Sequence, residues 1–234
     1  MATCGSTPNE GKIAVALTRY TEELVKGLAP RTWFLPNAVD RRYFKVNATL
    51  QARPRILFVG SICERKNPIG LIRACESMLR AGECIISFAG EGDPQGAYRK
   101  EFDALLKTLP GLELLGFLDR DTLGEEFRRT SILVLPTFED NCPMVVLEGM
   151  AAGLPVAASR VGGVPDLITH DHDGVMFNPH DFENMRSCLE TLVRDPSTCA
   201  RLGAQGRISA QERFHPKIIA GEHLRIYREV LALT

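Results

Sequence analysis

The sequence predicts an α/β protein with a parallel, Rossmann-like β-sheet and helices on both faces. Short apolar runs alternate with helical patterns through the middle of the chain, which is the order typical of a parallel sheet. Several of these runs end at a glycine, where a strand can turn sharply. The composition, with 44% hydrophobic and 24% charged residues among 234, is that of an ordinary globular protein.

The charge balance and the cysteines limit the class of protein. The formal net charge is −1, so no nucleic-acid partner is predicted. No apolar run approaches the roughly 18 residues of a membrane span, and no signal peptide is expected in the polar first twelve residues, which we interpret as a loose end. The seven cysteines form no CxxC pair. We therefore expect a cytoplasmic protein with at most peripheral contact at the inner membrane face.

The first strands and helices are predicted from their own patterns. The apolar run 56–59 ends at Gly60 and indicates a buried parallel strand. Apolar residues at helical spacing follow, and Pro68 suits a first helical position and Gly82 a C-terminal stop, so one helix is expected over 68–81. The next predicted elements are a strand at 85–89, an amphipathic helix at 98–109 and a strand at 112–118.

The alternation continues to residue 179, and the rest of the chain is predicted to be helical. Breaks are expected near Asp195-Pro196 and Phe214–Pro216, because proline disrupts a helix interior. The predicted elements of this half are a helix at 122–130, a strand at 131–137, a helix at 143–153, a strand at 154–159, a short helix at 162–169 and a strand at 174–179. The first fifty residues do not follow this rhythm. They suggest a strand or loop, a helix and a strand that leads into a turn.

Ligands of open parallel sheets bind at the carboxyl ends of the strands. Here those ends are predicted at Gly60-Ser61, Gly90–Gly92, Gly116-Phe117, Pro136-Thr137 and Ser159. The helix that begins near Pro143 adds free amides and the positive end of its dipole, which together favour an anion such as phosphate. The alternative is that water, Asn141 or Asp140 caps this helix.

Charged side chains gather near the same strand ends. Glu148 lies in an apolar helical stretch, where an ionised carboxylate needs a partner. It either reaches a cleft and accepts hydrogen bonds from a ligand such as a sugar, or it bonds a neighbouring backbone amide. Arg65 and Lys66 follow the first strand and could meet an anion, although a lysine in a loop is more often simply solvated.

Two acidic clusters have the composition of a metal site. Asp119-Arg120-Asp121 is better interpreted as a cap for the helix at Thr122, and Asp171-His172-Asp173 as a turn before Gly174. The histidine and carboxylate spacing does not fit a closed zinc site. No metal and no cofactor is therefore expected.

Several of these motifs resemble those of a known protein family. Gly60 with Lys66, "FAGEGD", "LLGFL" and the stretch from Leu135 to Ile168 resemble the C-terminal, donor-binding domain of the retaining GT-B glycosyltransferases of group 1, family four. The resemblance covers about residues 34–230. Its hallmark is an acid and a glutamate separated by seven residues, here Asp140 and Glu148. Asp140 replaces the usual glutamate, Glu139 is an alternative to it, and Ser61 replaces a usual arginine.

The resemblance implies a nucleotide-sugar site on one half of a GT-B fold. Lys66, Asp140 and Glu148 would be catalytic: Lys66 on the departing diphosphate, Asp140 on the sugar and distal phosphate, and Glu148 on the ribose. The donor-binding residues would be Gly60, Ser61, Arg65, Glu91, Gly116, Phe117, Asn141, Cys142, Pro143, Met144 and Val145. The nucleoside diphosphate sugar is a substrate, and no metal is required. The expected reaction is transfer of a hexose-type sugar to a glycan or lipid-linked acceptor.

The same resemblance implies that the acceptor domain is missing. Residues 1–35 would be a tail, linker and remnant of that domain, and residues 36–234 the donor domain with its C-terminal crossover helix. The chain would then be a fragment, an expressed piece or one half of a split enzyme. A non-catalytic nucleotide-sugar-binding subunit that works with a separate acceptor-domain protein is the alternative. A GT-B epimerase fits the seven-residue spacing less well.

Overall fold

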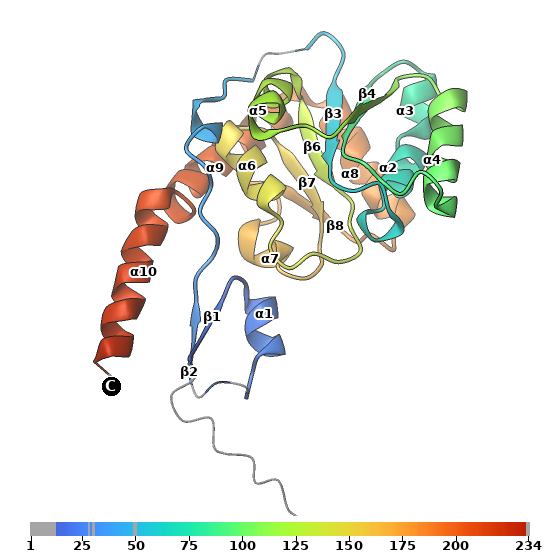
Figure 1. The fold of residues 1–234 in the computed structure, drawn as a ribbon. Helices are drawn as coiled ribbons and strands as arrows, with labels where there is room; N and C mark the ends of the chain where they lie inside the picture. The colour runs from blue at the N-terminus through green and yellow to red at the C-terminus, as the bar shows by residue number, and fades with distance from the viewer. Residues whose placement is uncertain (1–12, 28, 30, 49–50, 233–234) are drawn as a thin grey trace, which may run out of the picture.

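The computed structural model describes residues 13–27, 29, 31–48 and 51–232, and the predicted loose end at 1–12 lies outside these residues. Six strands form one parallel sheet in the order β5-β4-β3-β6-β7-β8 (Figure 1). This confirms the predicted parallel sheet. The strands are β3 (Arg55–Val59), β4 (Ile85–Ala89), β5 (Leu112–Gly116), β6 (Ile132–Leu135), β7 (Val156–Ser159) and β8 (Val175–Phe177).

The helices between the strands cover both faces of the sheet, as predicted. They are α2 (Pro68–Ala74), α3 (Glu76–Arg80), α4 (Ala97–Thr108), α5 (Arg120–Arg129), α6 (Met144–Ala152) and α7 (Val164–Leu167). The C-terminal helices α8 (Phe182–Arg194), α9 (Pro196–Arg213) and α10 (Pro216–Leu231) break where prolines were expected to break them. No helix in the described part of the chain is long and apolar enough to cross a bilayer.

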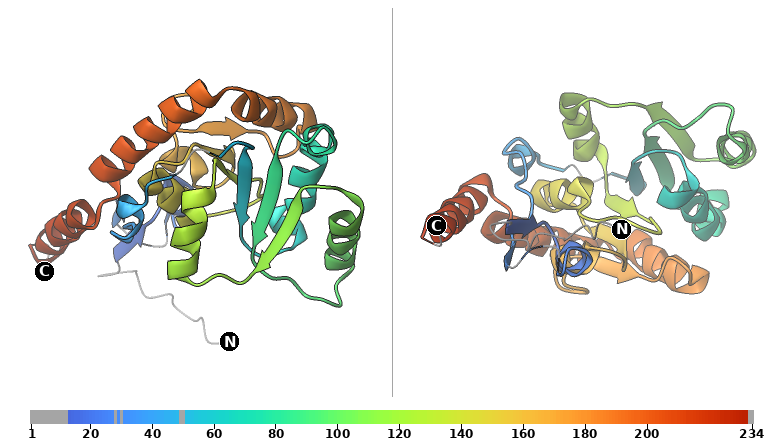
Figure 2. Two further views of the ribbon diagram at one scale, coloured as in Figure 1. Left: turned by 90° about the horizontal axis from the view of Figure 1, so that it is seen from above. Right: turned by 60° about the horizontal axis from the view of Figure 1, so that its bottom comes forward.

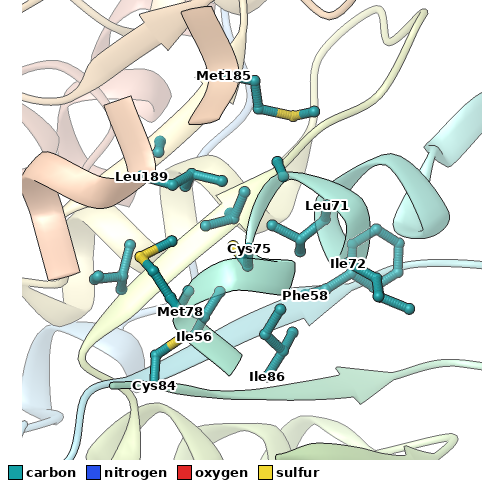
Figure 3. Packing of buried hydrophobic residues seen from close by; sticks show 14 of the residues in the cluster. Ile56, Phe58, Leu71, Ile72, Cys75, Met78, Cys84, Ile86, Met185 and Leu189 are labelled. Carbon is teal, nitrogen blue, oxygen red and sulfur yellow. The ribbon is translucent and has the colours of Figure 1, made fainter. Parts of the chain in front are cut away.

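Alternating side chains of each strand build two cores, because successive residues point to opposite faces. Ile56 and Phe58 of β3 pack with residues of α2, α3, α4 and α8 (Figure 3). Leu57, between them, packs on the other face with residues of α5, α6 and α7. Both faces of the sheet are thus buried, which explains why its strands are continuous apolar runs and not alternating ones.

The prediction of a single helix over 68–81 is wrong in one respect. It is divided at Cys75 into α2 and α3. The Cys75 amide is shared between the carbonyl oxygens of Leu71 and Ile72, at 3.1 and 3.2 Å, so the regular hydrogen-bond ladder is interrupted there. Apolar residues on both sides of the break still face the core (Figure 3), which is why the hydrophobic pattern alone looked continuous.

The strand order reverses at the centre of the sheet. The chain builds β3, β4 and β5 toward one edge, then returns to place β6 beside β3 and continues to the other edge. The connections that leave β3 and β6 therefore diverge and open a crevice at the carboxyl ends of these two strands. This is where the structure brings the predicted ligand-binding loops together.

Residues 13–34 form a separate unit, with β1 (Ile13–Ala16), α1 (Arg19–Leu24) and β2 (Arg31–Phe34). β1 and β2 pair in a two-stranded parallel sheet of their own, below the main sheet in the view of Figure 1. Trp33 of β2 packs against Ile219 and Ile226 of α10, which carries the C-terminus away from the main sheet (Figure 2). The last helix and the N-terminal unit therefore support each other.

Candidate functional site

The helix α6 begins without a side-chain cap. Pro143 is its N-cap residue, and neither Asp140 nor Asn141 caps it with a side chain. This excludes the side-chain capping that the sequence had left open. The amides of Met144 and Val145 have no acceptor among the described residues, so they remain available to a ligand. An uncapped helix start at a strand-loop-helix junction is suited to an anion.

The loop after β3 is joined to the loop after β6 by several hydrogen bonds. The Arg65 carbonyl oxygen accepts from the Phe138 amide at 2.8 Å and from the Thr137 hydroxyl at 3.0 Å. The Arg65 guanidinium donates to the Glu139 carbonyl oxygen at 3.0 Å. Thr137 is fully buried, and its hydroxyl also lies 2.8 Å from the Glu139 carbonyl oxygen. These contacts hold the two loops at a fixed separation across the crevice.

Lys66 and Asp140 form an ion pair across this crevice. The Lys66 ammonium contacts the Asp140 carboxylate directly, and the two side chains are only 16% and 14% exposed. They lie in the loops that follow two neighbouring strands, because β3 and β6 pair in the sheet. Lys66 is thus not a solvated loop lysine, and it meets the first acid of the predicted pair, while the Glu139 residue is exposed.

The start of α7 fixes the position of the Asp140 backbone. The Gly163 amide donates to the Asp140 carbonyl oxygen at 3.1 Å. A Cβ on Gly163 would lie 1.9 Å from the Asn141 carbonyl oxygen, so only glycine permits this approach. The "VGG" segment after β7 therefore supports the acidic loop from behind, a role that was not assigned from the sequence.

Glu148 lies on α6, about one turn from the uncapped helix start. It is partly buried, and its carboxylate has no hydrogen-bond partner among the described residues. Burial raises the pKa of Glu148 to about 7, although Arg120 opposes this rise and Asp40 adds to it. The alternative that Glu148 bonds a neighbouring backbone amide is not observed. The carboxylate is free to accept hydrogen bonds from a ligand.

Three residues near Glu148 were missed as site residues. Tyr43 in the short 3-10 helix η1 (Tyr43–Lys45) has a pKa raised to about 12, mainly by burial and also by the charge of Glu148. Asp40 and Arg120 act on both groups through their charges. The sequence predicted no site role for Asp40 and Tyr43, and it assigned Asp119-Arg120-Asp121 to a helix cap.

The predicted donor-binding residues on the other side of the crevice follow β3, β4 and β5. The Gly90 amide donates to the Gly116 carbonyl oxygen at 2.7 Å, which ties the ends of β4 and β5 together. The Glu91 carbonyl oxygen accepts from the Ile62 amide at 2.8 Å, beside Gly60 and Ser61. Phe117 is 75% exposed, so its ring is available for a flat ligand to stack on.

An open pocket of 420 Å³ adjoins the ion pair. It is lined by Leu17, Arg65, Glu139, Asp140, Asn141 and Cys142. Burial raises the pKa of the Cys142 thiol, and Asn37 donates a hydrogen bond to its sulfur at 3.6 Å. Cys142 is therefore a neutral lining group at neutral pH. Leu17 shows that the N-terminal unit contributes to the same pocket.

The two acidic clusters have structural roles in the fold. The Asp119 carboxylate accepts from the amides of Asp121 and Thr122, at 3.1 and 2.8 Å, and caps α5 as predicted. Asp173 is buried and accepts from the Thr169 amide at 2.7 Å. In the part of the chain that the structure describes, no cluster of three histidine, cysteine or acidic side chains is arranged to hold a metal ion.

Comparison with known proteins gives consistent matches. The family model of glycosyl transferases group 1 matches residues 53–195. The sulfoquinovosyl transferase SQD2 of Arabidopsis thaliana is 32% identical over 158 residues, which cover 66% of this chain and 29% of that protein. The chain thus spans less than a third of the length of this curated relative.

Two solved structures share the fold. A sucrose-phosphate synthase from Thermosynechococcus elongatus matches 97% of this chain and 60% of its own, with a TM-score of 0.83 and 22% identity. The Anabaena protein HepE, solved in complex with UDP, matches 92% of this chain and 63% of its own, with a TM-score of 0.80 and 18% identity. The neighbours are GT-B glycosyltransferases, in agreement with the predicted fold class.

Proposed function

Because this chain belongs to the glycosyl transferases group 1 family, we propose that it is the nucleotide-sugar-binding part of a retaining glycosyltransferase. The observation that carries the proposal is the Lys66–Asp140 ion pair beside the uncapped start of α6, with Glu148 on the same helix. A cation, free amides and a carboxylate without a hydrogen-bond partner among the described residues are together suited to a diphosphate and a sugar.

Each group has a distinct role in the proposed complex. The diphosphate lies at the amides of Met144 and Val145, with Lys66 neutralising the charge that develops on the leaving group. Preorganised electrostatic help of this kind contributes roughly a few kcal/mol to catalysis. Glu148 accepts hydrogen bonds from the ribose hydroxyls, and Asp140 and the amides of Asn141 and Cys142 meet the sugar. The UDP bound by the Anabaena neighbour supports a nucleotide as the ligand.

In this proposal the nucleobase of the donor lies on the side of β4 and β5. Gly60, Ser61, Glu91, Gly116 and Phe117 form this side of the proposed site, and Arg65 stands beside the diphosphate. The ring of Phe117 is the most exposed apolar surface of this group. The reaction proceeds without a metal or cofactor in this proposal, and a hexose-type sugar passes to a glycan or lipid-linked acceptor.

The acceptor is held by a part of the enzyme outside residues 36–234 in this proposal. A parallel sheet is normally buried on both faces, and a two-stranded sheet such as β1–β2 is marginal alone. Exposed apolar side chains gather on this unit and on α10: Val15, Leu17, Leu24, Phe34, Leu224 and Tyr227. This supports an acceptor domain that covers these side chains. In this proposal residues 1–35 include a remnant of that domain, and the enzyme works in the cytoplasm or at the cytoplasmic face of a membrane.

The exposed apolar surface also favours a second candidate. The chain would then be a non-catalytic subunit that binds a nucleotide sugar and works with a separate acceptor-domain protein. Both candidates predict that the isolated chain binds the donor and transfers almost no sugar, because donor and acceptor must be held together. Sugar transfer measured after adding the acceptor-domain protein distinguishes the two candidates. Transfer that is lost when Glu148 or Lys66 is replaced supports the first candidate, in which this chain is part of the enzyme.

Thermal shift measurements with UDP, GDP and ADP and their sugars test donor binding. A ligand that binds only the native state raises the melting temperature. We expect Glu148→Gln to weaken binding of the nucleoside part, and Lys66→Ala to reduce affinity for the diphosphate more than for the nucleoside. No shift with any nucleotide at millimolar concentration would contradict the proposal. Equal loss of all ligands in both variants would contradict the division of roles.

A further inference from the structure

The Lys66 ammonium has a partner before any ligand arrives. Its contact with Asp140 is largely shielded from water, at 16% and 14% exposure of the two side chains. A second cation, Arg65, lines the pocket and donates to the Glu139 carbonyl oxygen at 3.0 Å. A ligand phosphate at Lys66 must therefore compete with a carboxylate for the same ammonium.

The backbone that carries the carboxylate is held in place whether or not the carboxylate keeps this partner. The Asp140 carbonyl oxygen is held by the Gly163 amide at 3.1 Å, and the neighbouring loop is held by the bonds to Arg65. A diphosphate that takes Lys66 consequently leaves Asp140 charged, nearly buried and close to phosphate oxygens. Like charges at short range in a site of reduced dielectric repel each other strongly.

A nucleotide sugar relieves this repulsion in two ways. Its terminal phosphate is esterified, so it carries about one negative charge fewer than the nucleoside diphosphate. Its sugar also brings hydroxyl groups, which can donate hydrogen bonds to the released Asp140 carboxylate. The free nucleoside diphosphate has neither property.

We propose that the Lys66–Asp140 ion pair makes this site select the intact nucleotide sugar over the nucleoside diphosphate that remains after transfer. The inference rests on the proposed function and adds a specificity determinant to it. The same repulsion would aid departure of the spent nucleotide, a step that limits the rate of many enzymes. Asp140 would thus act on substrate choice through its charge, in addition to any contact with the sugar.

Calorimetry with matched ligand pairs tests this proposal. The probes are UDP and UDP-glucose, GDP and GDP-mannose, and ADP and ADP-glucose, at one fixed ionic strength. Asp140→Asn should tighten binding of the nucleoside diphosphate about tenfold and leave the nucleotide sugar unchanged or weaker, because the repelling charge is gone. Glu139→Gln removes the same charge from the adjacent, exposed residue and should leave the ratio of the two affinities within about twofold of wild type.

A second variant keeps the test valid if Asp140→Asn does not fold, which the unliganded melting curve reveals. Lys66→Gln leaves Asp140 without its cation, so the diphosphate should lose more affinity than the nucleotide sugar. The proposal is overturned if neither variant changes the ratio, or if Glu139→Gln changes it as much as Asp140→Asn. Failure of wild type to bind either member of every pair would instead refute the proposed function.

Discussion

The backbones of Gly60 and Gly90 touch where β3 and β4 end at the candidate site. A Cβ on Gly90 would lie 2.0 Å from the Gly60 carbonyl oxygen, and Gly90 has a φ of +149° that other residues rarely adopt. The two strand ends therefore approach as closely as glycine allows. This contact aligns the loops that carry Ser61 and Glu91.

Gly90→Ala should consequently destabilise the protein by about 3 kcal/mol or more, because the added methyl group meets backbone and cannot be accommodated by a side-chain movement. Gly116→Ala is the matched control at the end of β5. Its φ of +70° is strained for alanine, but a Cβ there meets nothing within 4 Å, so about 1 kcal/mol is expected. Urea unfolding measures both, and equal losses would contradict the close-contact explanation.

Glu148 should make stability depend on pH. Burial raises its pKa from 4.5 to about 7, so between these values the folded protein holds a proton that the unfolded chain has released. The free energy of unfolding therefore falls as the pH rises from about 4.5 to about 7. Glu148→Gln cannot titrate, and near pH 8 it should be about 2 kcal/mol more stable than wild type, with no such gain near pH 4.

Denaturant unfolding at both pH values checks this expectation. Glu212→Gln, which replaces an exposed glutamate on α9, controls for the loss of one negative charge. A gain for Glu148→Gln that is the same at both pH values would show that the effect does not come from titration of Glu148.

Two buried hydroxyl groups at the ends of neighbouring strands should respond differently to removal. Ser159 on β7 is buried, and its hydroxyl has no hydrogen-bond partner among the described residues, whereas Thr137 after β6 contacts the carbonyl oxygens of Arg65 and Glu139. Ser159→Ala should stay within about 0.5 kcal/mol of wild type or be more stable, and Thr137→Val should cost about 1–3 kcal/mol.

Thermal unfolding of the two variants gives this comparison. Thr137→Val should also weaken nucleotide binding, because the hydroxyl helps to join the loops that carry Lys66 and Asp140. Equal stability of both variants would indicate that the contacts of Thr137 do not hold these loops together.

Nucleotide binding should not depend on a divalent metal. The Asp119 carboxylate caps α5, and the buried Asp173 carboxylate accepts a hydrogen bond from the Thr169 amide. Neither carboxylate is therefore arranged to bridge a metal to a phosphate. Dissociation constants for the nucleotide measured by calorimetry with a chelator and with added magnesium or manganese should agree. Affinity that requires a metal would contradict the proposed role of Lys66 as the neutralising charge.

The sequence by itself determined the elements and which residues stand at their ends. Hydrophobic periodicity, prolines and glycines are local signals, and they placed the strands of the main sheet within a few residues of their observed bounds. The spacing of Asp140 and Glu148 is also local, because both belong to one loop and the helix that follows it. The sequence did not predict that one helix is divided at Cys75, because the apolar pattern continues across the break.

Only the tertiary structure decided which of these residues meet. Lys66 reaches Asp140 because the strand order places β3 beside β6, and no local pattern encodes the pairing of segments 74 positions apart. The grouping of Asp40, Tyr43 and Arg120 around Glu148 has the same cause, since η1, α5 and α6 converge only when the sheet is assembled. The raised pKa of Glu148 follows from that burial, and so it too belongs to the fold and not to the sequence pattern.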